Sequence, residues 1–341
     1  MRIPLLVLGV WVLSIVLTGW LRGYALRTRL LDMPNARSSH SRPTPRGGGM
    51  AIVAGFVLGL LACRWLGAVS DDLLAALLGG GLAIAAVGYI DDRRGVPVRW
   101  RLAVHVAAAA WALWWLGPPP ALPLPGGEWR LELLGYPLAL LLIVWLLNLY
   151  NFMDGIDGIA GVETVTVAGG AAVLAMLAGD GAAALPLLLL AAAAAGFLLW
   201  NWPPAKIFMG DVGSAFIGFV LAAFALGGEG PLNPWVWPIL LGVFLVDASY
   251  TLLRRLLRGE AIHQVHRSHA YQRASRRLGA HRPVTVAVAA INLCWLWPLA
   301  WIALRHPELG PLLTLTAWAP LVGLAIALGA GERDEVVGAS A

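Results

Sequence analysis

Eleven apolar stretches dominate the chain, and each is long enough, or nearly so, to cross a membrane as a helix. A membrane-spanning helix needs about 20 consecutive, mainly apolar residues. Gly-rich and Pro-rich runs separate many of these stretches, as expected for connections between helices. The predicted spans are residues 3–21, 50–68, 73–90, 100–116, 133–150, 159–178, 182–200, 214–228, 235–253, 284–304 and 311–330.

The composition supports the same conclusion. Only 13% of the 341 residues are charged and 59% are hydrophobic, whereas soluble domains carry roughly 25% charged residues. An ordinary soluble enzyme, a disordered chain and a secreted disulfide scaffold are therefore excluded. We expect an all-α polytopic membrane protein with eleven, or alternatively ten, spans, forming a single domain over residues 1–341.

The basic residues predict the orientation of the chain, because cytoplasmic loops carry an excess of Lys and Arg. If the N-terminus is external, all but four of the 24 Lys and Arg residues fall in loops on the inner side. The cytoplasmic loops then include residues 22–49 and 254–283. The exceptions are Arg2, Arg64, Arg130 and Arg305.

Five polar segments fall on the predicted inner side, and their acidic, amide and histidine residues are independent of the Lys and Arg residues that predict the orientation. The first, residues 32–49, carries Arg46 beside three glycines, and its backbone N–H groups could cradle an anion.

The second segment places Asp91 and Asp92 at the end of one span and Arg101 at the start of the next. Adjacent carboxylates repel each other unless a cation or arginines compensate. A metal, a pair acting on phosphate or an ion-pair network would each explain them.

The third segment has a polar residue at every third position. A continuous helix would spread these residues around its circumference, because three residues fall about 60° short of a turn. An Asp-Gly-Ile-Asp-Gly run instead lets the backbone turn, so that all four can converge on one hydrated pocket. Such a group at the end of an apolar span is costly without a ligand. Its members are Asn148, Asn151, Asp154 and Asp157.

The fourth segment, residues 201–214, contains Lys206 and Asp211. Asp211 follows a glycine at the mouth of a span, where a carboxylate suits a hard cation such as Mg²⁺. A helix N-cap is the alternative role for Asp211. The start of that span also offers free N–H groups to an anion.

The fifth segment, residues 247–282, carries eight arginines and four histidines. The spacing of His263, His266 and His269 suits one face of a helix. Zinc is one reading, but arginines with histidines fit a phosphate or pyrophosphate better. For Asp247, a structural role in which it pairs with Arg254 or Arg255 is as well supported as a functional one.

Carboxylates able to hold a divalent cation thus meet a dense set of arginines at one membrane surface. Joining two phosphorylated reactants requires such a site, because a metal and arginines offset their repulsion. A membrane transporter of phosphorylated or nucleotide-linked solutes is the alternative, and it would place polar residues near the midplane. Here the polar groups cluster at one end of the spans. The formal charge of +5 therefore does not call for nucleic acid as a partner.

These motifs, in this order, resemble the polyprenyl-phosphate N-acetylhexosamine-1-phosphate transferases of glycosyltransferase family 4. The resemblance rests on Asp91-Asp92, residues 148–158, Phe208-Met-Gly-Asp-Val-Gly-Ser214 and the His-Arg-Ser-His-Ala-Tyr-Gln run at 266–272. It implies transfer of a sugar 1-phosphate from a UDP-sugar to undecaprenyl phosphate, with Mg²⁺ (or Mn²⁺) and release of UMP. It also implies a multi-pass protein of the bacterial inner membrane with a periplasmic N-terminus and a cytoplasmic active site, and it allows a homodimer.

The resemblance also implies roles for individual residues. Asp211 and Asn151 match metal-binding positions, and Asp157 matches the position that meets the uracil. Asp91 and Asp92 match a pair assigned to the acceptor phosphate or to general-base work, and Asp154 completes the predicted catalytic set.

The remaining predicted site residues bind substrate. Arg101 falls where the family places a basic residue for phosphate, and the loop at 266–269 faces the pyrophosphate and sugar. The predicted substrate-binding residues, besides Asp157, are Arg101, Arg46, Asn148, Lys206, His266, Arg267 and His269.

The histidines distinguish two branches of the family. The branch that uses muramoyl-pentapeptide nucleotides has consecutive histidines in its last loop, whereas His266 and His269 are separated here. The chain therefore resembles the branch that initiates O-antigen and other surface polysaccharides. Its expected donors are UDP-GlcNAc, UDP-FucNAc or UDP-QuiNAc.

Overall fold

A computed structural model describes residues 2–34, 42–227, 230–260 and 266–333 of the chain. The structure is mostly helical, at 75%. Within the described residues, seven helices are long and apolar enough to cross a membrane. The chain is therefore a multi-pass membrane protein, as its composition predicts. These helices are Ile3–Thr28, Asp71–Arg94, Glu132–Met153, Ile159–Leu177, Gly181–Asn201, Arg282–Arg305 and Pro307–Ala327.

Each of the eleven predicted spans contains a helix, while the number of membrane crossings and their orientation stay predictions. The α-helices are α1 (Arg2–Thr28), α2 (Gly49–Trp65), α3 (Asp71–Ala75), α4 (Gly81–Arg94), α5 (Val98–Leu116), α6 (Glu132–Met153), α7 (Ile159–Leu177), α8 (Gly181–Asn201), α9 (Asp211–Leu226), α10 (Val236–Leu240), α11 (Gly242–Leu257), α12 (Ala270–Leu278), α13 (Arg282–Ile291), α14 (Trp297–Arg305) and α15 (Gly310–Ala327). A π-helical turn at Ala76–Gly80 joins α3 to α4, and another at Asn292–Leu296 joins α13 to α14. A 3₁₀ turn at Pro307–Leu309 precedes α15.

Two short antiparallel strand pairs add to the helices, so the all-α prediction holds for the spans but not for every loop. β1 (Leu31–Asp32) pairs with β2 (Thr44–Pro45), and β3 (Leu122–Leu124) pairs with β4 (Gly127–Trp129). The β3–β4 turn contains Gly126 at φ +101°, a backbone conformation that favours glycine.

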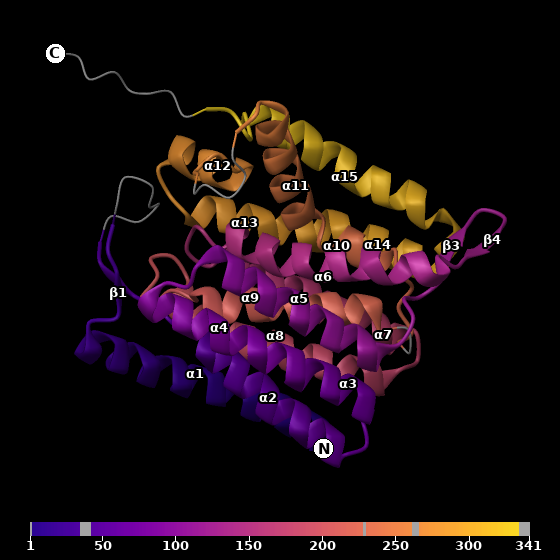
Figure 1. Cartoon of the computed structure of the whole chain (residues 1–341), viewed down its shortest axis with the longest axis horizontal. Coiled ribbons are helices and arrows are strands. Elements are labelled where there is room, and N and C mark those ends of the chain that lie inside the picture. The colour runs from indigo at the N-terminus through magenta and orange to yellow at the C-terminus, as the bar shows by residue number, and fades with distance from the viewer. Residues whose placement is uncertain (1, 35–41, 228–229, 261–265, 334–341) are drawn as a thin grey trace.

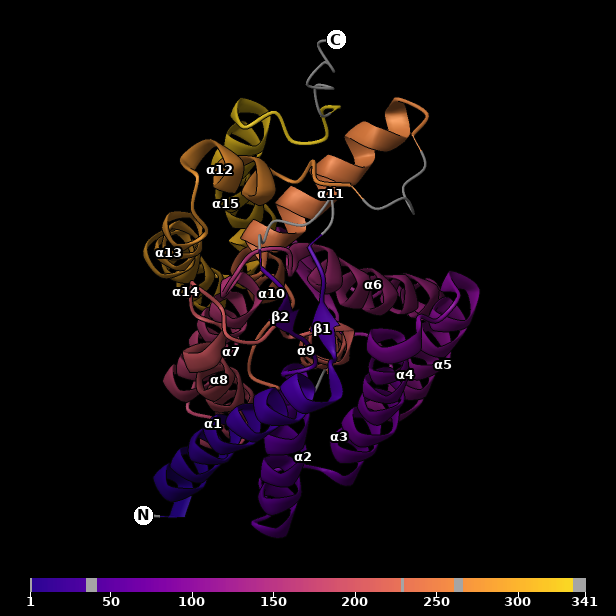
Figure 2. The ribbon, with the colours of Figure 1, turned by 90° about the vertical axis from the view of Figure 1, so that its left-hand side faces the viewer.

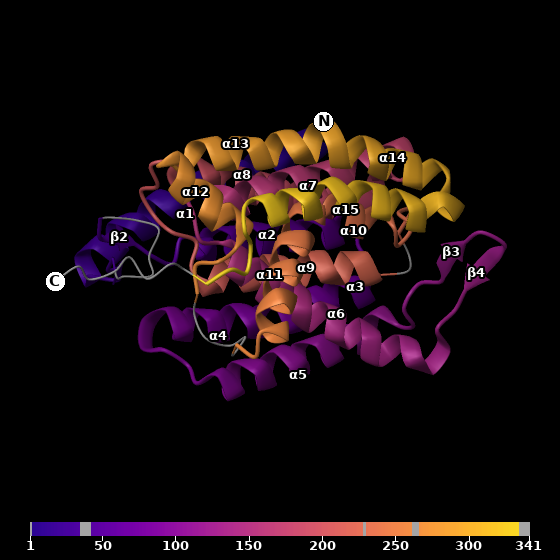
Figure 3. The same ribbon diagram turned by 90° about the horizontal axis from the view of Figure 1, so that it is seen from above.

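Most helices run side by side between two ends of the molecule (Figure 1). One end carries β1 and α12, and the other carries the β3–β4 hairpin. α9 packs against α4 and α6, and α8 packs against α1, α2 and α7. After Asp211, α9 has no charged residue and is buried along most of its length. A helix that is apolar on all sides is expected in such a central place. Seen from above, α9 lies between α15 and the α4–α5 pair (Figure 3).

The predicted span at 235–253 is not one straight helix. It is divided into α10 and α11, and α11 runs steeply across the other helices (Figures 1 and 2). α11 buries Asp247, Thr251 and Arg255 but exposes Leu253 and Leu257. The polar face of α11 therefore packs against the rest of the protein. The mean hydropathy of the span does not reveal this orientation.

Two predicted loops are partly helical. α1 continues through residues 22–28, α11 continues through 254–257, and α12 occupies 270–278. The end of an apolar run marks a change in polarity and not the end of a helix. Arg and Leu are both good helix formers, so the helix continues beyond that point. Conversely, His266 and His269 precede α12 rather than share a helical face, and His263 lies outside the described residues.

Candidate active site

Helix ends bring the predicted polar segments together at one end of the bundle. α4 and α6 end there, and α5, α7 and α9 begin there (Figure 2). The segment after β2 lies against the loop before α9, because Gly48 and Gly49 donate N–H groups to the carbonyls of Phe208 and Met209 at 2.9 and 2.8 Å. Residues from distant parts of the chain therefore face one another at this end.

Asp211 lies between two arginines. Its Oδ1 is 2.7 Å from Arg46 Nη2, and its Oδ2 is 3.3 Å from Arg101 Nη1. Arg101 also pairs with Asp91, which in addition accepts the backbone N–H of Val96. The structure thus assembles the ion-pair network that was one of the explanations for the paired aspartates. With Asp92, three carboxylates face the two guanidiniums of Arg46 and Arg101 in this network.

Asp92 points at the first turn of α9. Its oxygens accept the backbone N–H groups of Asp211 and Val212 at 2.9 and 3.2 Å. Arg46 Nε lies 2.8 Å from the same carboxylate, whose side chain is only 1% exposed. Asp92 therefore satisfies N–H groups that a helix start leaves unpaired, and this contact places Asp211. Its predicted catalytic role stays a prediction.

Gly88 is a residue that the sequence reasoning missed. A Cβ at Gly88 would lie 2.7 Å from the backbone carbon and oxygen of Asp211. Only glycine lets α4 approach α9 so closely, and this approach brings Asp92 onto the start of α9. The available signal was a glycine one helical turn before a paired aspartate in an apolar helix.

The third polar segment turns as predicted, because α6 ends at Met153 and α7 begins at Ile159. Asn151 Oδ1 accepts a hydrogen bond of 3.5 Å from Ser214, one turn along α9 from Asp211. Asp154 caps α6, and its pKa is raised by burial and by the carboxylates of Asp211 and Asp92. Asn151 and Asp154 therefore belong to the same cluster as Asp211.

Asn148 and Asp157 point elsewhere, so the four residues do not share one pocket. Asn148 lies one turn deeper, where its amide contacts His105 at 3.5 Å and the Val144 carbonyl at 2.7 Å. The Asp157 carboxylate accepts the N–H of Ala205 at 3.0 Å and lies 3.2 Å from His281 Nδ1.

Asp157 opens onto a cavity of about 730 Å³. The cavity is large enough for a nucleoside, and its wall combines an aromatic ring with basic side chains. The sequence reasoning gave no role to the other wall residues. They include Arg42, Thr44, Phe208, His281 and Arg282.

Residues 266–269, which we call the histidine loop, lie directly before α12. His266 Nδ1 is 3.0 Å from Ser268 Oγ, and burial lowers the pKa of His266 to about 3, with His269 and Arg255 acting in the same direction. His269 is buried with Nδ1 3.3 Å from Asp247. Arg267 is half-buried and makes no ion pair within the described part of the chain. This loop therefore presents a neutral imidazole and an available guanidinium.

Asp247 has the structural role that was one of two readings, but with different partners. Instead of Arg254 or Arg255, it accepts the N–H groups of Ala270 and Tyr271, each at 2.9 Å. It thereby holds the start of α12. The Tyr271 hydroxyl in turn donates to the Phe152 carbonyl at 2.9 Å, near the end of α6.

Lys206 is exposed, and its ammonium lies over the Trp200 ring at 5.6 Å from the centroid. No ion pair links it to a carboxylate among the described residues. Its predicted contact with substrate stays a prediction.

Asp211 and Asn151 fit one kind of magnesium site. The described residues contain no group of three or more His, Cys, Asp or Glu side chains arranged around a metal. Mg²⁺, however, commonly takes one or two protein ligands and completes its octahedron with water and substrate phosphates. A carboxylate and an amide oxygen at the start of α9 match that pattern.

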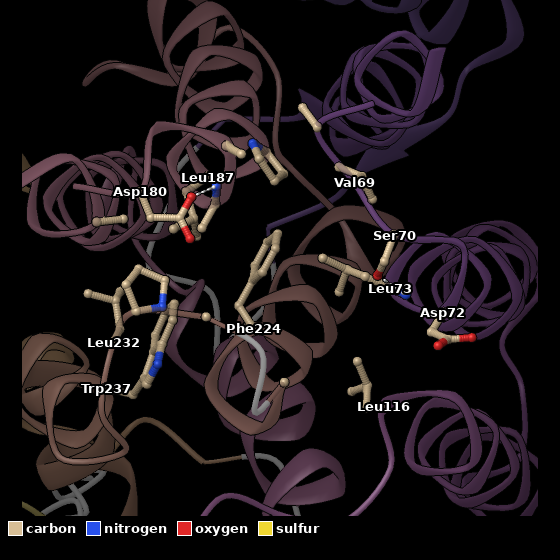
Figure 4. A pocket seen from close by; sticks show the side chains of 18 of the residues that line it. Val69, Ser70, Asp72, Leu73, Leu116, Asp180, Leu187, Phe224, Leu232 and Trp237 are labelled. Carbon is tan, nitrogen blue, oxygen red and sulfur yellow. Dashed lines mark hydrogen bonds between the residues drawn. The ribbon is translucent and has the colours of Figure 1, made fainter. Parts of the chain in front are cut away.

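A second pocket, of about 230 Å³, is bounded where α3 and α8 begin and where α5 and α9 end (Figure 4). Because α9 begins at Asp211, this pocket lies at the opposite end of the helices from the carboxylate cluster. Its wall includes Ser70, Asp72, Asp180, Phe224 and Trp237. None of the predicted site residues lies there.

Comparison with known proteins identifies the family. The sequence profile described as glycosyl transferase family 4 matches residues 74–229, which include Asp91, Asp92 and Asp211. A probable undecaprenyl-phosphate N-acetylglucosaminyl 1-phosphate transferase of Bacillus subtilis (strain 168) is 30% identical over 287 residues, 82% of this chain and 78% of its own length. The chain belongs to glycosyl transferase family 4.

Other relatives of this family 4 protein carry two kinds of name. A decaprenyl-phosphate N-acetylglucosaminephosphotransferase of Mycolicibacterium smegmatis is 32% identical and covers 82% of this chain and 75% of its own. A phospho-N-acetylmuramoyl-pentapeptide-transferase of Synechococcus sp. (strain CC9605) is 36% identical and covers 62% and 64%. The family predicted from the motifs is confirmed.

Proposed function

We propose that this family 4 protein transfers an N-acetylhexosamine 1-phosphate from a UDP-sugar to undecaprenyl phosphate and releases UMP. The observation that carries the proposal is Asp211 held between Arg46 and Arg101 at the ends of apolar helices. Relatives named as undecaprenyl- and decaprenyl-phosphate transferases support the acceptor class. The reaction is assigned to the cytoplasmic face of the bacterial inner membrane, because most basic residues fall in loops on that predicted side.

The proposed chemistry is a single in-line displacement. An oxygen of the lipid phosphate attacks the β-phosphorus of the UDP-sugar, and the bond from that phosphorus to the oxygen shared with the α-phosphate breaks. UMP leaves with that oxygen. The second pKa of a phosphomonoester is near 6, so the attacking dianion exists at pH 7 without a strong base. Asp91 already pairs with Arg101, and Asp92 already accepts N–H groups at the start of α9. These contacts support a role for both residues in positioning the groups of the site.

Charge neutralisation is the main contribution of the site. Two phosphorylated reactants repel each other, and Arg46 and Arg101 place guanidiniums beside the carboxylate cluster. Mg²⁺, held by Asp211 and Asn151, would supply further positive charge to the donor pyrophosphate. The uridine is placed in the cavity beside Asp157, and the sugar beside His266 and Arg267.

The donor is proposed to be UDP-GlcNAc or a 6-deoxy analogue such as UDP-FucNAc or UDP-QuiNAc. The separation of His266 and His269 supports this choice over a muramoyl-pentapeptide nucleotide. The product would initiate O-antigen or another surface polysaccharide.

The proposal is tested with the purified protein in detergent, undecaprenyl phosphate, Mg²⁺ and a panel of UDP-N-acetylhexosamines. We expect UMP and a labelled lipid pyrophosphate sugar with one donor, and loss of both products with EDTA. A transporter would leave the UDP-sugar intact. Absence of UMP with every donor would refute the proposed reaction.

The single-step mechanism has its own test. With labelled donor and no lipid acceptor, no sugar phosphate should remain attached to the protein. A labelled adduct on Asp91, Asp92 or Asp154 would instead establish a covalent intermediate.

A further inference from the structure

Several arginines of the predicted phosphate-binding segment do not face the carboxylate cluster. They converge on the residues that follow α15, Leu328–Glu332, which we call the C-terminal strap. Arg254 Nη1 donates to the Ala330 carbonyl and Arg258 Nη1 to the Gly331 carbonyl, both at 2.8 Å. These arginines belong to α11 and the residue after it, so the strap is joined to that helix.

The strap is also joined to α12. Arg273 Nε donates to the Leu328 carbonyl at 2.9 Å. Carbonyls at a helix C-terminus lack partners within the helix and carry partial negative charge, so they attract guanidiniums. Ala330 is fully buried and packs with Ala270 at the start of α12. The strap is therefore packed as well as hydrogen-bonded.

Glu332 links the two helices through its carboxylate. Its Oε1 is 3.2 Å from Arg254 Nη2 on α11, and its Oε2 is 3.2 Å from Arg273 Nη2 on α12. The Glu332 side chain is 42% exposed, so each ion pair by itself is weak. Together they close a bridge between the two helices that flank the histidine loop.

The strap contacts the histidine loop directly. The N–H of Gly331 donates to the Ser268 carbonyl at 2.8 Å. Ser268 is buried, and its hydroxyl lies 3.0 Å from His266 Nδ1. Arg267 and His269 are its immediate neighbours in the chain. Asp247 thus holds the first residues of α12, directly after the loop, and the strap holds the backbone of the loop itself at Ser268.

We propose that Glu332 is a positioning residue for the UDP-sugar: through the strap it sets the backbone of the loop that carries His266 and Arg267. The inference rests on the proposed function, which places this loop against the donor. Glu332 touches no reacting group, so its loss affects donor binding and leaves acceptor binding and the chemical step in place.

The kinetic test compares Glu332→Ala and Glu332→Asp with the wild-type chain. Loss of two partly exposed ion pairs is expected to raise the KM for the UDP-sugar by about 2- to 30-fold. The kcat and the KM for undecaprenyl phosphate should change less than about 3-fold. Glu332→Asp keeps the charge and should recover part of the loss. Glu308→Ala, at the other end of α15 with a 54% exposed side chain, is the matched control and should behave as wild type.

A second measurement does not depend on the reaction. Hydrogen exchange of the full-length protein without substrates should show faster exchange at Gly331 and at residues 268–271 in Glu332→Ala, with no change elsewhere. Unchanged exchange there would overturn the proposed hold on the loop. Faster exchange with an unchanged donor KM, or a lower kcat at constant KM, would overturn the role in donor binding. If no donor is turned over by the wild type, the proposed function fails, and exchange still decides whether the strap holds the loop.

Discussion

Replacement of Asp92 tests whether this residue holds the start of α9. Its carboxylate accepts two backbone N–H groups and pairs with Arg46 Nε at 2.8 Å, almost fully buried. Hydrogen bonds to a charged group contribute about 1.5–3 kcal/mol each, and breaking a buried ion pair costs about 3–5 kcal/mol. Arg46 is 32% exposed and keeps Asp211 as a partner, which reduces the second cost.

We therefore expect Asp92→Ala to lower the free energy of unfolding by at least about 3 kcal/mol, roughly a hundredfold or more in the unfolding equilibrium. Asp92→Asn keeps one oxygen that accepts from α9 and should lose about 1–2 kcal/mol. Transfer activity should fall in both variants, because Asp211 loses its place.

The assay is the denaturation midpoint in detergent, measured with UMP release on the same samples. Asp72→Asn is the matched control, because Asp72 is an exposed acid at the opposite end of the same helical rod. Its stability should stay within about 0.5 kcal/mol of the wild type. A wild-type midpoint for Asp92→Ala would refute the capping role. An inactive Asp92→Asn with full stability would place Asp92 in the chemistry.

Four further predictions concern the same end of the molecule. Asp211→Asn should abolish UMP release while the denaturation midpoint shows a folded protein, and retained Mg²⁺-dependent activity would contradict the metal assignment. Gly88→Ala should destabilise the protein by about 1–3 kcal/mol and reduce transfer, because the new Cβ collides with the backbone at Asp211. Gly23→Ala, with open space at its Cβ, is its control, and equal midpoints for the two variants would contradict the packing argument. Arg267→Ala should raise the KM for the UDP-sugar. Unchanged kinetics with every donor would show that Arg267 contributes only to the orientation of the chain in the membrane. Burial lowers the pKa of His266 from 6.5 to about 3. As the pH falls, His266 is therefore protonated at a higher pH in the unfolded chain than in the folded protein, and the free energy of unfolding should fall from about pH 6.5 towards pH 3. His266→Gln should show a shallower loss of stability between pH 7 and 5, and an identical slope in both proteins would count against a half-buried imidazole that stays neutral.

Local patterns in the sequence predicted correctly where several candidate site residues lie along the helices. The glycine-rich turn after Met153 and the isolated Asp211 at the start of an apolar helix both stand at helix ends, as predicted. A residue can be placed at a helix end from its neighbours in the sequence alone, without knowledge of how the helices pack together. The expected convergence of Asn148 and Asp157 on one pocket with Asn151 and Asp154 was wrong, because the direction of each side chain depends on the neighbouring helices.

The basic loop shows the other limit of sequence reasoning. Arg254, Arg258 and Arg273 have the composition of a phosphate site, yet they bind the C-terminal strap. A guanidinium pairs with whichever carboxylate or carbonyl the fold brings within reach. In this chain the strap lies 55 to 76 residues further along than these arginines, so no local sequence pattern pairs them with it.

The sequence by itself determined that this is a helical membrane protein of glycosyl transferase family 4 with its charged motifs at helix ends. Apolarity over about 20 residues is a local property, and so is the order of the motifs. Only the tertiary structure decided that Asp92 holds α9, that Asp157 faces a cavity of its own and that Glu332 bridges α11 and α12. Each of these contacts joins helix ends that are far apart in the chain, and their meeting depends on close approaches such as Gly88 against Asp211.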